Sequence, residues 1–205
     1  MDGIKIESFS LGRFFTNTYF VLNLKEKKIV IIDAPSGISS IVSKFEKKGF
    51  APLFVLLTHA HIDHIEGLKE IKLPFYLHPQ DKEFLHNPNL NLSSLLGSPL
   101  VIDNSPLFLK DKIEIGRDYF FEVIHTPGHT PGSVSFKLNN YLFCGDTLFF
   151  DSIGRTDIPL ADYNSLLKSL KEKIITLDKD IFIFPGHGPF TTLGRELENN
   201  PFLKE

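Results

Sequence analysis

Apolar and polar positions along the chain predict short β-strands in both halves. Alternating apolar residues and runs of β-branched or aromatic residues are typical of strands, and the Gly, Pro and Asn residues between them mark turns. The expected strands cover residues 4–8, 18–24, 28–32, 53–57, 74–77, 120–125, 133–138, 141–145 and 181–184. The run at 53–57 is apolar throughout, which favours a strand buried on both faces. Asn139-Asn140 fits a two-residue hairpin turn, because Asn tolerates positive φ.

Two other stretches have helical periodicity. Apolar residues at 38, 41, 42 and 45 follow Ser36, the expected N-cap, and precede Gly49, the expected stop. A second stripe at 166, 167, 170 and 174 follows Asp162, another expected N-cap. Residues 80–86 predict a short helix, and the Asn-, Ser-, Pro- and Gly-rich residues 87–106 predict a long loop or lid with partial helix. Helices interspersed among strands predict an α/β fold, and no linker divides the chain.

Composition excludes several classes of protein. The 205 residues are 42% hydrophobic and include 20 Phe, enough apolar surface to exclude disorder of the whole chain. The formal net charge of −3 argues against a nucleic-acid-binding protein. One cysteine, Cys144, cannot form an intramolecular disulfide. No signal peptide or membrane-spanning run is visible, so we expect a soluble cytoplasmic protein without a membrane partner.

The strongest chemical signal is His59-Ala60-His61-Ile62-Asp63-His64, directly after the strand predicted at 53–57. Three imidazoles and a carboxylate within six residues indicate a metal-ligand cluster. In extended backbone His59 and His61 project to the same side, whereas Asp63 and His64 begin the next turn. One ion would not readily accept all four side chains from so short a loop. We therefore expect two metal ions to share the segment.

Three further candidate ligands, His129, Asp146 and His187, also follow predicted strands, in loops rich in Gly and Pro. Loops at strand ends are the usual place for site residues on an α/β scaffold. Each residue alone could instead be a cap or a hydrogen-bonded loop residue, and Asp63 could cap a helix over 64–70. Three histidines crowded into one loop favour the metal site. For the remaining histidines and the cysteine we expect ordinary structural roles: His78, His86, His125 and Cys144.

Together these motifs resemble the metallo-β-lactamase superfamily, and within it the short bacterial glyoxalase II-like (hydroxyacylglutathione hydrolase-like) proteins. The resemblance spans nearly the whole chain and rests on the histidine-rich loop followed in order by His129, Asp146 and His187. Residues 145–149, 152–157 and 185–196 carry the glyoxalase II-like part. The resemblance implies a four-layer αβ/βα sandwich of two mixed β-sheets flanked by helices, with a dinuclear site at the sheet edges.

The resemblance also implies a role for each site residue. One metal ion would be held by His59, His61 and His129, the other by Asp63, His64 and His187, with Asp146 bridging them. Zinc is the expected metal, with iron and manganese as alternatives that accept the same ligands. Asp63 and Asp146 are the expected catalytic carboxylates. Arg155 and Arg195 are candidates for binding a substrate carboxylate; the alternative is an ion pair, such as Arg155 with Asp157 or Asp151.

The implied activity is hydrolysis of a small-molecule thioester, a hydroxyacylglutathione such as S-lactoylglutathione, by a metal-bridging hydroxide. A mononuclear iron persulfide dioxygenase and a non-catalytic metal-binding protein are the alternative functions. We expect residues 1–205 to form one hydrolase domain without the C-terminal helical domain with which full-length glyoxalase II enzymes bind glutathione.

Overall fold

A computed structural model describes residues 3–204, and within this range the strands form two six-stranded sheets and a two-stranded hairpin. The first sheet contains, in spatial order, β1 (Ile4–Leu11), β2 (Thr16–Asn23), β3 (Lys28–Ile32), β4 (Ala51–Leu56), β5 (Phe75–Leu77) and β6 (Leu107–Phe108). The second contains β14 (Thr191–Thr192), β13 (Phe182–Pro185), β10 (Tyr141–Gly145), β9 (Val134–Leu138), β8 (Phe120–His125) and β7 (Lys112–Glu114). The hairpin pairs β11 (Leu148–Phe149) with β12 (Ser152–Ile153).

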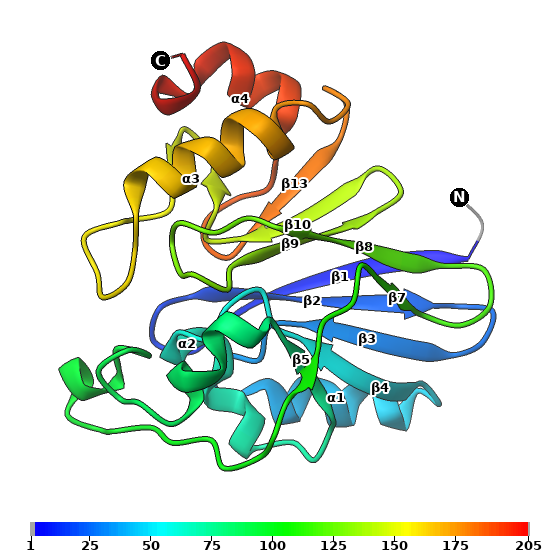
Figure 1. Ribbon diagram of the computed structural model, residues 1–205. Helices are drawn as coiled ribbons and strands as arrows, with labels where there is room; N and C mark the ends of the chain where they lie inside the picture. Colours follow the sequence, from blue (N-terminus) through cyan, green and yellow to red (C-terminus); the bar gives the residue numbers. More distant parts are fainter. Residues whose placement is uncertain (1–2, 205) are drawn as a thin grey trace.

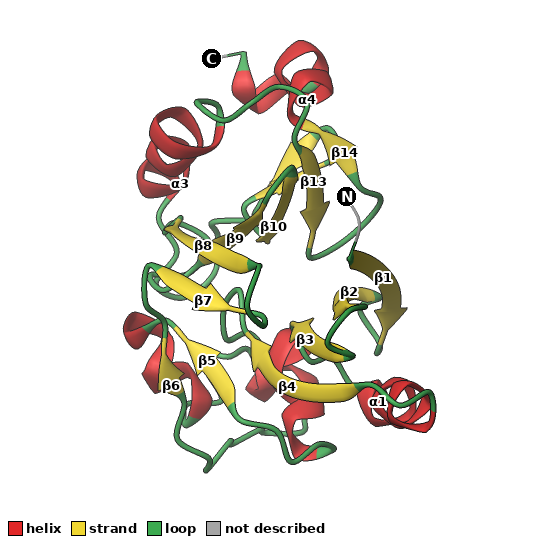
Figure 2. Ribbon diagram, turned by 90° about the vertical axis from the view of Figure 1, so that its right-hand side faces the viewer, coloured by secondary structure: helices red, strands yellow, loops and turns green. Residues whose placement is uncertain are grey.

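Both sheets are mixed. In the first, β1 to β3 pair antiparallel and β3 to β6 pair parallel. In the second, β10 and β13 are parallel, and the other neighbours are antiparallel. The two sheets face each other, with α1 (Ile38–Lys47) and α2 (Ile62–Ile65) outside the first and α3 (Tyr163–Ser169) and α4 (Leu193–Asn199) outside the second (Figures 1 and 2). The predicted four-layer sandwich is therefore confirmed.

Short helical turns complete the chain. Short 3₁₀ helices span Glu66–Lys69, Pro79–Leu85, Ser93–Leu96 and Pro201–Leu203, and a π-helical turn, Leu170–Ile174, extends α3. Among the described residues no helix is both long and apolar enough to cross a membrane.

The side chains of β3 show why this strand is apolar throughout after Lys28. Ile29 and Ile31 pack into the core between the first sheet and its helices, and Val30 and Ile32 pack into the core between the two sheets. Successive side chains of a strand point to opposite faces, so a strand with both faces covered carries no polar stripe. The core between the sheets is rich in aromatic residues, among them Tyr19, Phe121, Phe136 and Phe143.

Two predicted element boundaries are confirmed, one by a backbone angle and one by a hydrogen bond. Asn139 adopts a positive φ of 52° in the turn between β9 and β10. The Asp162 carboxylate accepts a 2.7 Å hydrogen bond from the Ser165 amide and caps α3 as predicted. Residues 87–106 contain one 3₁₀ turn and otherwise irregular backbone.

The predicted N-cap of α1 is wrong. Gly37, with φ 90°, occupies that position, and the Glu70 carboxylate accepts hydrogen bonds from the amides of Gly37 (2.7 Å) and Ser39 (3.3 Å). The Ser36 hydroxyl donates to the same carboxylate. A side chain distant in sequence thus does what a local cap would do, which periodicity cannot reveal. The predicted burial at 53–57 also holds only in part, because Leu53 and Phe54 are half-buried.

Candidate metal centre

The structure brings all seven predicted ligand side chains together at one end of the two sheets. The histidine-rich loop follows β4, and the loops of His129, Asp146 and His187 follow β8, β10 and β13. Their candidate ligand atoms form three groups, each with all atoms within 4.8 Å of one another. The groups are His59, His61 and His129; His59, His64 and Asp146; and Asp63, His64 and His187. Because these groups share His59 and His64, they form one continuous cluster.

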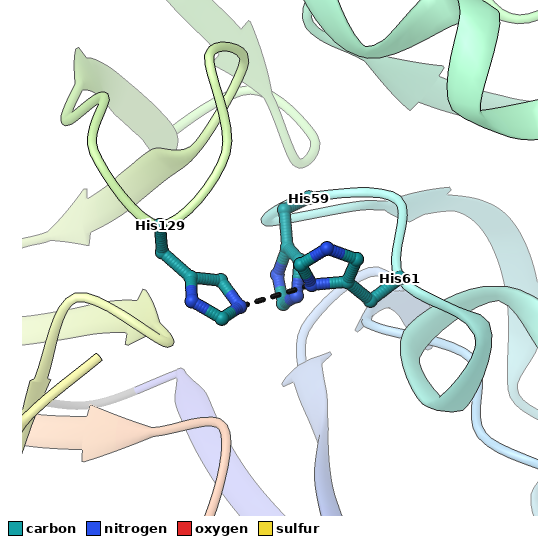
Figure 3. Close-up of side chains that lie close together, drawn as sticks. All are labelled: His59, His61 and His129. Atoms are coloured by element: carbon teal, nitrogen blue, oxygen red, sulfur yellow. Dashed lines mark hydrogen bonds between the residues drawn. The ribbon is translucent and has the colours of Figure 1, made fainter. Parts of the chain in front are cut away.

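The three imidazoles of His59, His61 and His129 converge from two loops (Figure 3). Their ring centroids are 4.7 to 4.8 Å apart, and each pair meets edge to face. The His61 Nδ1 lies 3.0 Å from the His129 Nε2. The first two residues come from the loop after β4 and the third from the loop after β8, so this group joins the two sheets.

The second part of the cluster is richer in carboxylate. The Asp63 Oδ2 lies 3.1 Å from the His187 Nε2 and 3.4 Å from the His64 Nε2. Asp146 lies between both parts of the cluster. Its Oδ1 is 3.5 Å from the His64 Nε2, and its Oδ2 is 3.5 Å from the His129 Nε2 and 3.6 Å from the His187 Nε2.

The free lone pairs of this cluster suit a cation. Four buried side-chain atoms among residues 3–204 have no hydrogen-bond partner: His59 Nε2, His61 Nε2, His64 Nε2 and Asp146 Oδ1. An unpaired buried polar atom costs free energy, so four in one cluster indicate a missing ligand. All are acceptors that transition metals prefer, and the donor set therefore fits one or more divalent ions.

Neighbouring groups fix which nitrogen each imidazole presents to the cluster. The His64 Nδ1 donates to the Asp33 carboxylate at 2.8 Å, and the His129 Nδ1 donates to the Arg155 carbonyl at 2.9 Å. The His187 Nδ1 donates to the Phe14 carbonyl at 3.2 Å. Each bond occupies Nδ1 and turns Nε2 towards the cluster, the usual arrangement for a metal-ligating histidine.

Burial and charge set the protonation of these groups. Burial lowers the pKa of His59 and of His61 well below the usual range, which keeps both imidazoles neutral. For His64 burial acts in the same direction, but the surrounding carboxylates, Asp63 first, outweigh it and raise the pKa to about 10. This position therefore attracts positive charge, which a divalent cation would also supply.

Gly186 permits the close approach of the ligands. A Cβ at this position would collide with the Asp146 Oδ1 and would stand 2.8 Å from the His64 Cε1. The backbone of Gly186 also bonds across the sheets, because its carbonyl accepts a 2.7 Å hydrogen bond from the Asn17 amide. The loop after β13 is thus held against β2, with the candidate ligand His187 beside the cluster.

Asp81 connects the loop after β4 with the loop after β8, the two loops that carry the three-histidine group. Its buried carboxylate accepts hydrogen bonds from the Ala60 amide (3.1 Å), the Thr130 hydroxyl (2.8 Å) and the Gly132 amide (2.7 Å). Ala60 lies between His59 and His61, and Thr130 follows His129. One side chain therefore fixes the spacing of the loops that carry the three-histidine group.

A pocket of about 490 Å³ opens over the cluster. Its floor includes His61, Asp63, His129, Asp146 and His187. Its walls are largely apolar and are formed by Phe14, Ile62, Leu92, Leu95, Leu96, Phe149, Ile153 and Ile158, with Ser152 and Arg155 as further lining residues. The candidate ligands are thus accessible to a small molecule.

The two arginines that were predicted to bind substrate differ in position. Arg155 lines the pocket, but its guanidinium makes a bidentate ion pair with Asp157 at 2.7 and 2.8 Å. Arg195 is not among the described residues that line the pocket. Its guanidinium bonds to Asp151 and Glu196 and lies 3.4 Å from the centroid of the Phe150 ring.

Sequence reasoning missed the residues that support the cluster. Asp33 bonds to His64 and to the amide and hydroxyl of Thr58, and the Thr16 hydroxyl donates to Asp63 at 2.8 Å. Asp33 follows the end of a predicted strand, the signal that identified the other site residues, and could have been found by it. Asp81 lies within a 3₁₀ turn and has no comparable signal.

Comparisons with known proteins agree with this fold. The family model of the metallo-beta-lactamase superfamily matches residues 11–187. A relative from Haemophilus influenzae, named hydroxyacylglutathione hydrolase GloC, is 35% identical over 192 residues, covering 87% of this chain and 88% of its own.

Two solved structures are also similar. The crystal structure of the BLEG-1 B3 metallo-beta-lactamase has a TM-score of 0.90 and 38% identity and covers 98% of this chain and 100% of its own. The crystal structure of TTHA1623 in a di-iron-bound form has a TM-score of 0.83 and 34% identity and covers 96% of this chain and 100% of its own.

Proposed function

The chain belongs to the metallo-β-lactamase superfamily, and from that premise we propose that it is a metal-dependent hydrolase whose substrate is a small-molecule thioester. S-lactoylglutathione is the first substrate to test, because a relative of nearly the same length is named a hydroxyacylglutathione hydrolase. The observation that carries the proposal is the cluster of unpaired imidazole and carboxylate atoms on the floor of an accessible pocket.

We propose two metal positions in this cluster. His59, His61 and His129 form one set of ligands and Asp63, His64 and His187 the other, with Asp146 shared between them. Its place between the sets supports the shared role, because its two oxygens lie 3.5 to 3.6 Å from histidines of both. Zinc is the proposed metal. Iron is the main alternative, because imidazole and carboxylate accept both and one similar structure is named as di-iron-bound.

Two bound divalent ions would supply a hydroxide at neutral pH, by lowering the pKa of a bound water towards about 7, and would stabilise the oxyanion of an attacked carbonyl. The chain's own residues hold the carboxylates in place for this chemistry. The Thr16 hydroxyl and the His187 imidazole both contact the Asp63 Oδ2, so this carboxylate has one orientation at the pocket floor.

A thioester suits the pocket because its leaving group needs no strong acid. A thiol has a pKa near 8.5, so the thiolate departs without a proton donor. Beyond the candidate ligands, the described lining residues that can carry a proton are Ser152 and Arg155, and neither is an acid of suitable strength at neutral pH. An amide, whose nitrogen must be protonated as it leaves, is a poorer match.

The test is metal analysis of the purified protein together with a thioesterase assay on S-lactoylglutathione, under argon and under air. We expect about two metal ions per chain and the same hydrolysis rate in both atmospheres. His61→Ala and Asp146→Asn should each lower both metal content and rate. Full activity in either variant would remove that residue from the proposed site. One ferrous ion per chain with oxygen uptake on glutathione persulfide would favour a dioxygenase instead.

A further inference from the structure

We propose that the pocket selects thioesters with an apolar acyl group of several carbons over those with a short one. This inference rests on the proposed thioester hydrolysis and adds the substrate class. Three features of the pocket carry it: a leucine wall, the way the backbone presents that wall, and the absence of an uncompensated cation among the described lining residues.

The leucine wall is formed by Leu92, Leu95 and Leu96. Leu95 is 78% exposed, whereas Leu100, five residues later, is buried. Phe14, which also lines the pocket, is 43% exposed. Large apolar side chains that remain open to water around a pocket are a typical sign of a binding surface for an apolar group.

Buried polar residues hold this wall in place. The buried Asn91 side chain donates to the carbonyls of Phe84 and Leu100 and accepts from the Ser93 amide, at 2.8 to 3.0 Å. Between Asn91 and Ser93, Leu92 has a positive φ of 67°, which is unfavourable for leucine. The backbone is thus constrained in a conformation that turns its leucines to the pocket.

The charge of the pocket supports an uncharged acyl group. Among the described lining residues other than histidine, Arg155 is the one cation, and its guanidinium is paired with Asp157. The acidic lining residues, Asp63 and Asp146, belong to the proposed metal centre. An anionic acyl group would therefore find no free counter-charge along the walls, whereas a hydrocarbon chain would find apolar contacts.

The experiment compares acyl chains on one neutral thiol. Acetyl, butyryl and hexanoyl thioesters of N-acetylcysteamine are assayed with the metal-replete protein, alongside S-lactoylglutathione. We expect kcat/KM to rise roughly threefold per added methylene, as burial of hydrocarbon predicts. Leu95→Ser should flatten this rise. Leu95 is exposed, so the variant should fold. The matched control, Leu24→Ser, changes an exposed leucine that does not line the pocket and should keep the rise.

Two outcomes separate this inference from the proposed function. If thioesters are cleaved at rates independent of chain length, the inference is overturned and the hydrolase remains. If no thioester is cleaved, the hydrolase proposal fails, and calorimetric binding of S-methyl and S-hexyl thioethers of N-acetylcysteamine tests the pocket alone. Tighter binding of the hexyl compound, lost in Leu95→Ser, would support the apolar site, and equal binding would overturn it.

Discussion

Gly186 shows how tightly the candidate ligands are packed. A Cβ here would collide with the Asp146 carboxylate, so we expect Gly186→Ala to displace that side chain and lower metal content per chain by about tenfold or more at limiting metal. Inductively coupled plasma analysis measures the metal.

Gly188→Ala is the control for this variant. Gly188 has φ 74°, but a Cβ there meets nothing within 4 Å. The control should therefore lose about 1 kcal/mol of stability through backbone strain and retain its metal. Equal metal content in both variants would show that the close approach at Gly186 is unimportant.

Substitution of Asp81 should affect both the stability of the fold and the affinity for metal. Asp81→Ala removes the acceptor for two buried amides and a hydroxyl, so we expect unfolding free energy to fall by about 2–4 kcal/mol. Because the lost bonds join the loops that carry the three-histidine group, metal affinity should fall as well. Denaturant unfolding of metal-free protein gives the first quantity and competition with a chelator the second. Asp103→Ala, at an exposed position, should change neither.

The candidate ligand residues could be predicted from sequence because the residue types His and Asp by themselves identify side chains that can bind metal. Arg195 illustrates the opposite case. Its pairing with Asp151 depends on how β14 and α4 pack beside the β11–β12 hairpin, which no local pattern encodes. Asp81 likewise acts only through two loops that are distant in sequence.

At the scale of elements, a stacked pair of imidazoles joins the two sheets. His78 follows β5 and His125 ends β8, and their ring centroids are 4.1 Å apart at an interplanar angle of 14°. Burial first, and the neighbouring His125 second, lower the pKa of His78 to about 4. Between about pH 4 and 6.5 the unfolded chain therefore binds more protons than the folded one at this residue.

This arrangement predicts a pH dependence of stability. Stability from His78 is present at neutral pH and is lost as pH falls through that window, so His78→Gln should flatten the decrease in unfolding free energy between pH 7 and pH 4.5. Urea unfolding of chelator-treated protein at several pH values measures this decrease in unfolding free energy. His86→Gln, at an exposed histidine, should retain the wild-type slope. If unfolding free energy depends on pH in His78→Gln as it does in the wild type, the His78–His125 stack is not the source of that dependence.

The long strands and the two amphipathic helices could be predicted because their periodicity extends over several residues. The elements that sequence reasoning missed are short. Strands β6, β11, β12 and β14 contain two residues each, β7 contains three, and α4 contains seven. Two residues cannot display an alternation, and these strands exist because a neighbouring backbone is in place to pair with them.

In the whole molecule, the candidate ligands come from both sheets. His59 to His64 belong to the first sheet's loops, and His129, Asp146 and His187 belong to the second's. Bound metal should therefore stabilise the contact between the two sheets. We expect a chelator to lower the free energy of unfolding by about 3–4 kcal/mol when free metal had exceeded its dissociation constant 100- to 1,000-fold.

Differential scanning calorimetry with and without chelator measures this effect. Hydrogen exchange should increase mainly in β2 and β13, whose backbones meet beside the cluster through Asn17 and Gly186. An unchanged melting temperature after complete metal removal would contradict a stabilising role for the metal. The expectation that residues 1–205 form one domain stays a prediction.

The wide separation of the candidate ligands along the chain also bears on biosynthesis. A ribosome adds about 5–20 residues per second, so the histidine-rich loop leaves it on the order of ten seconds before His187 does. His129 and Asp146 follow during that interval, while the supporting contact to Gly186 is still unmade. The full set of seven candidate ligands thus becomes available only late in translation.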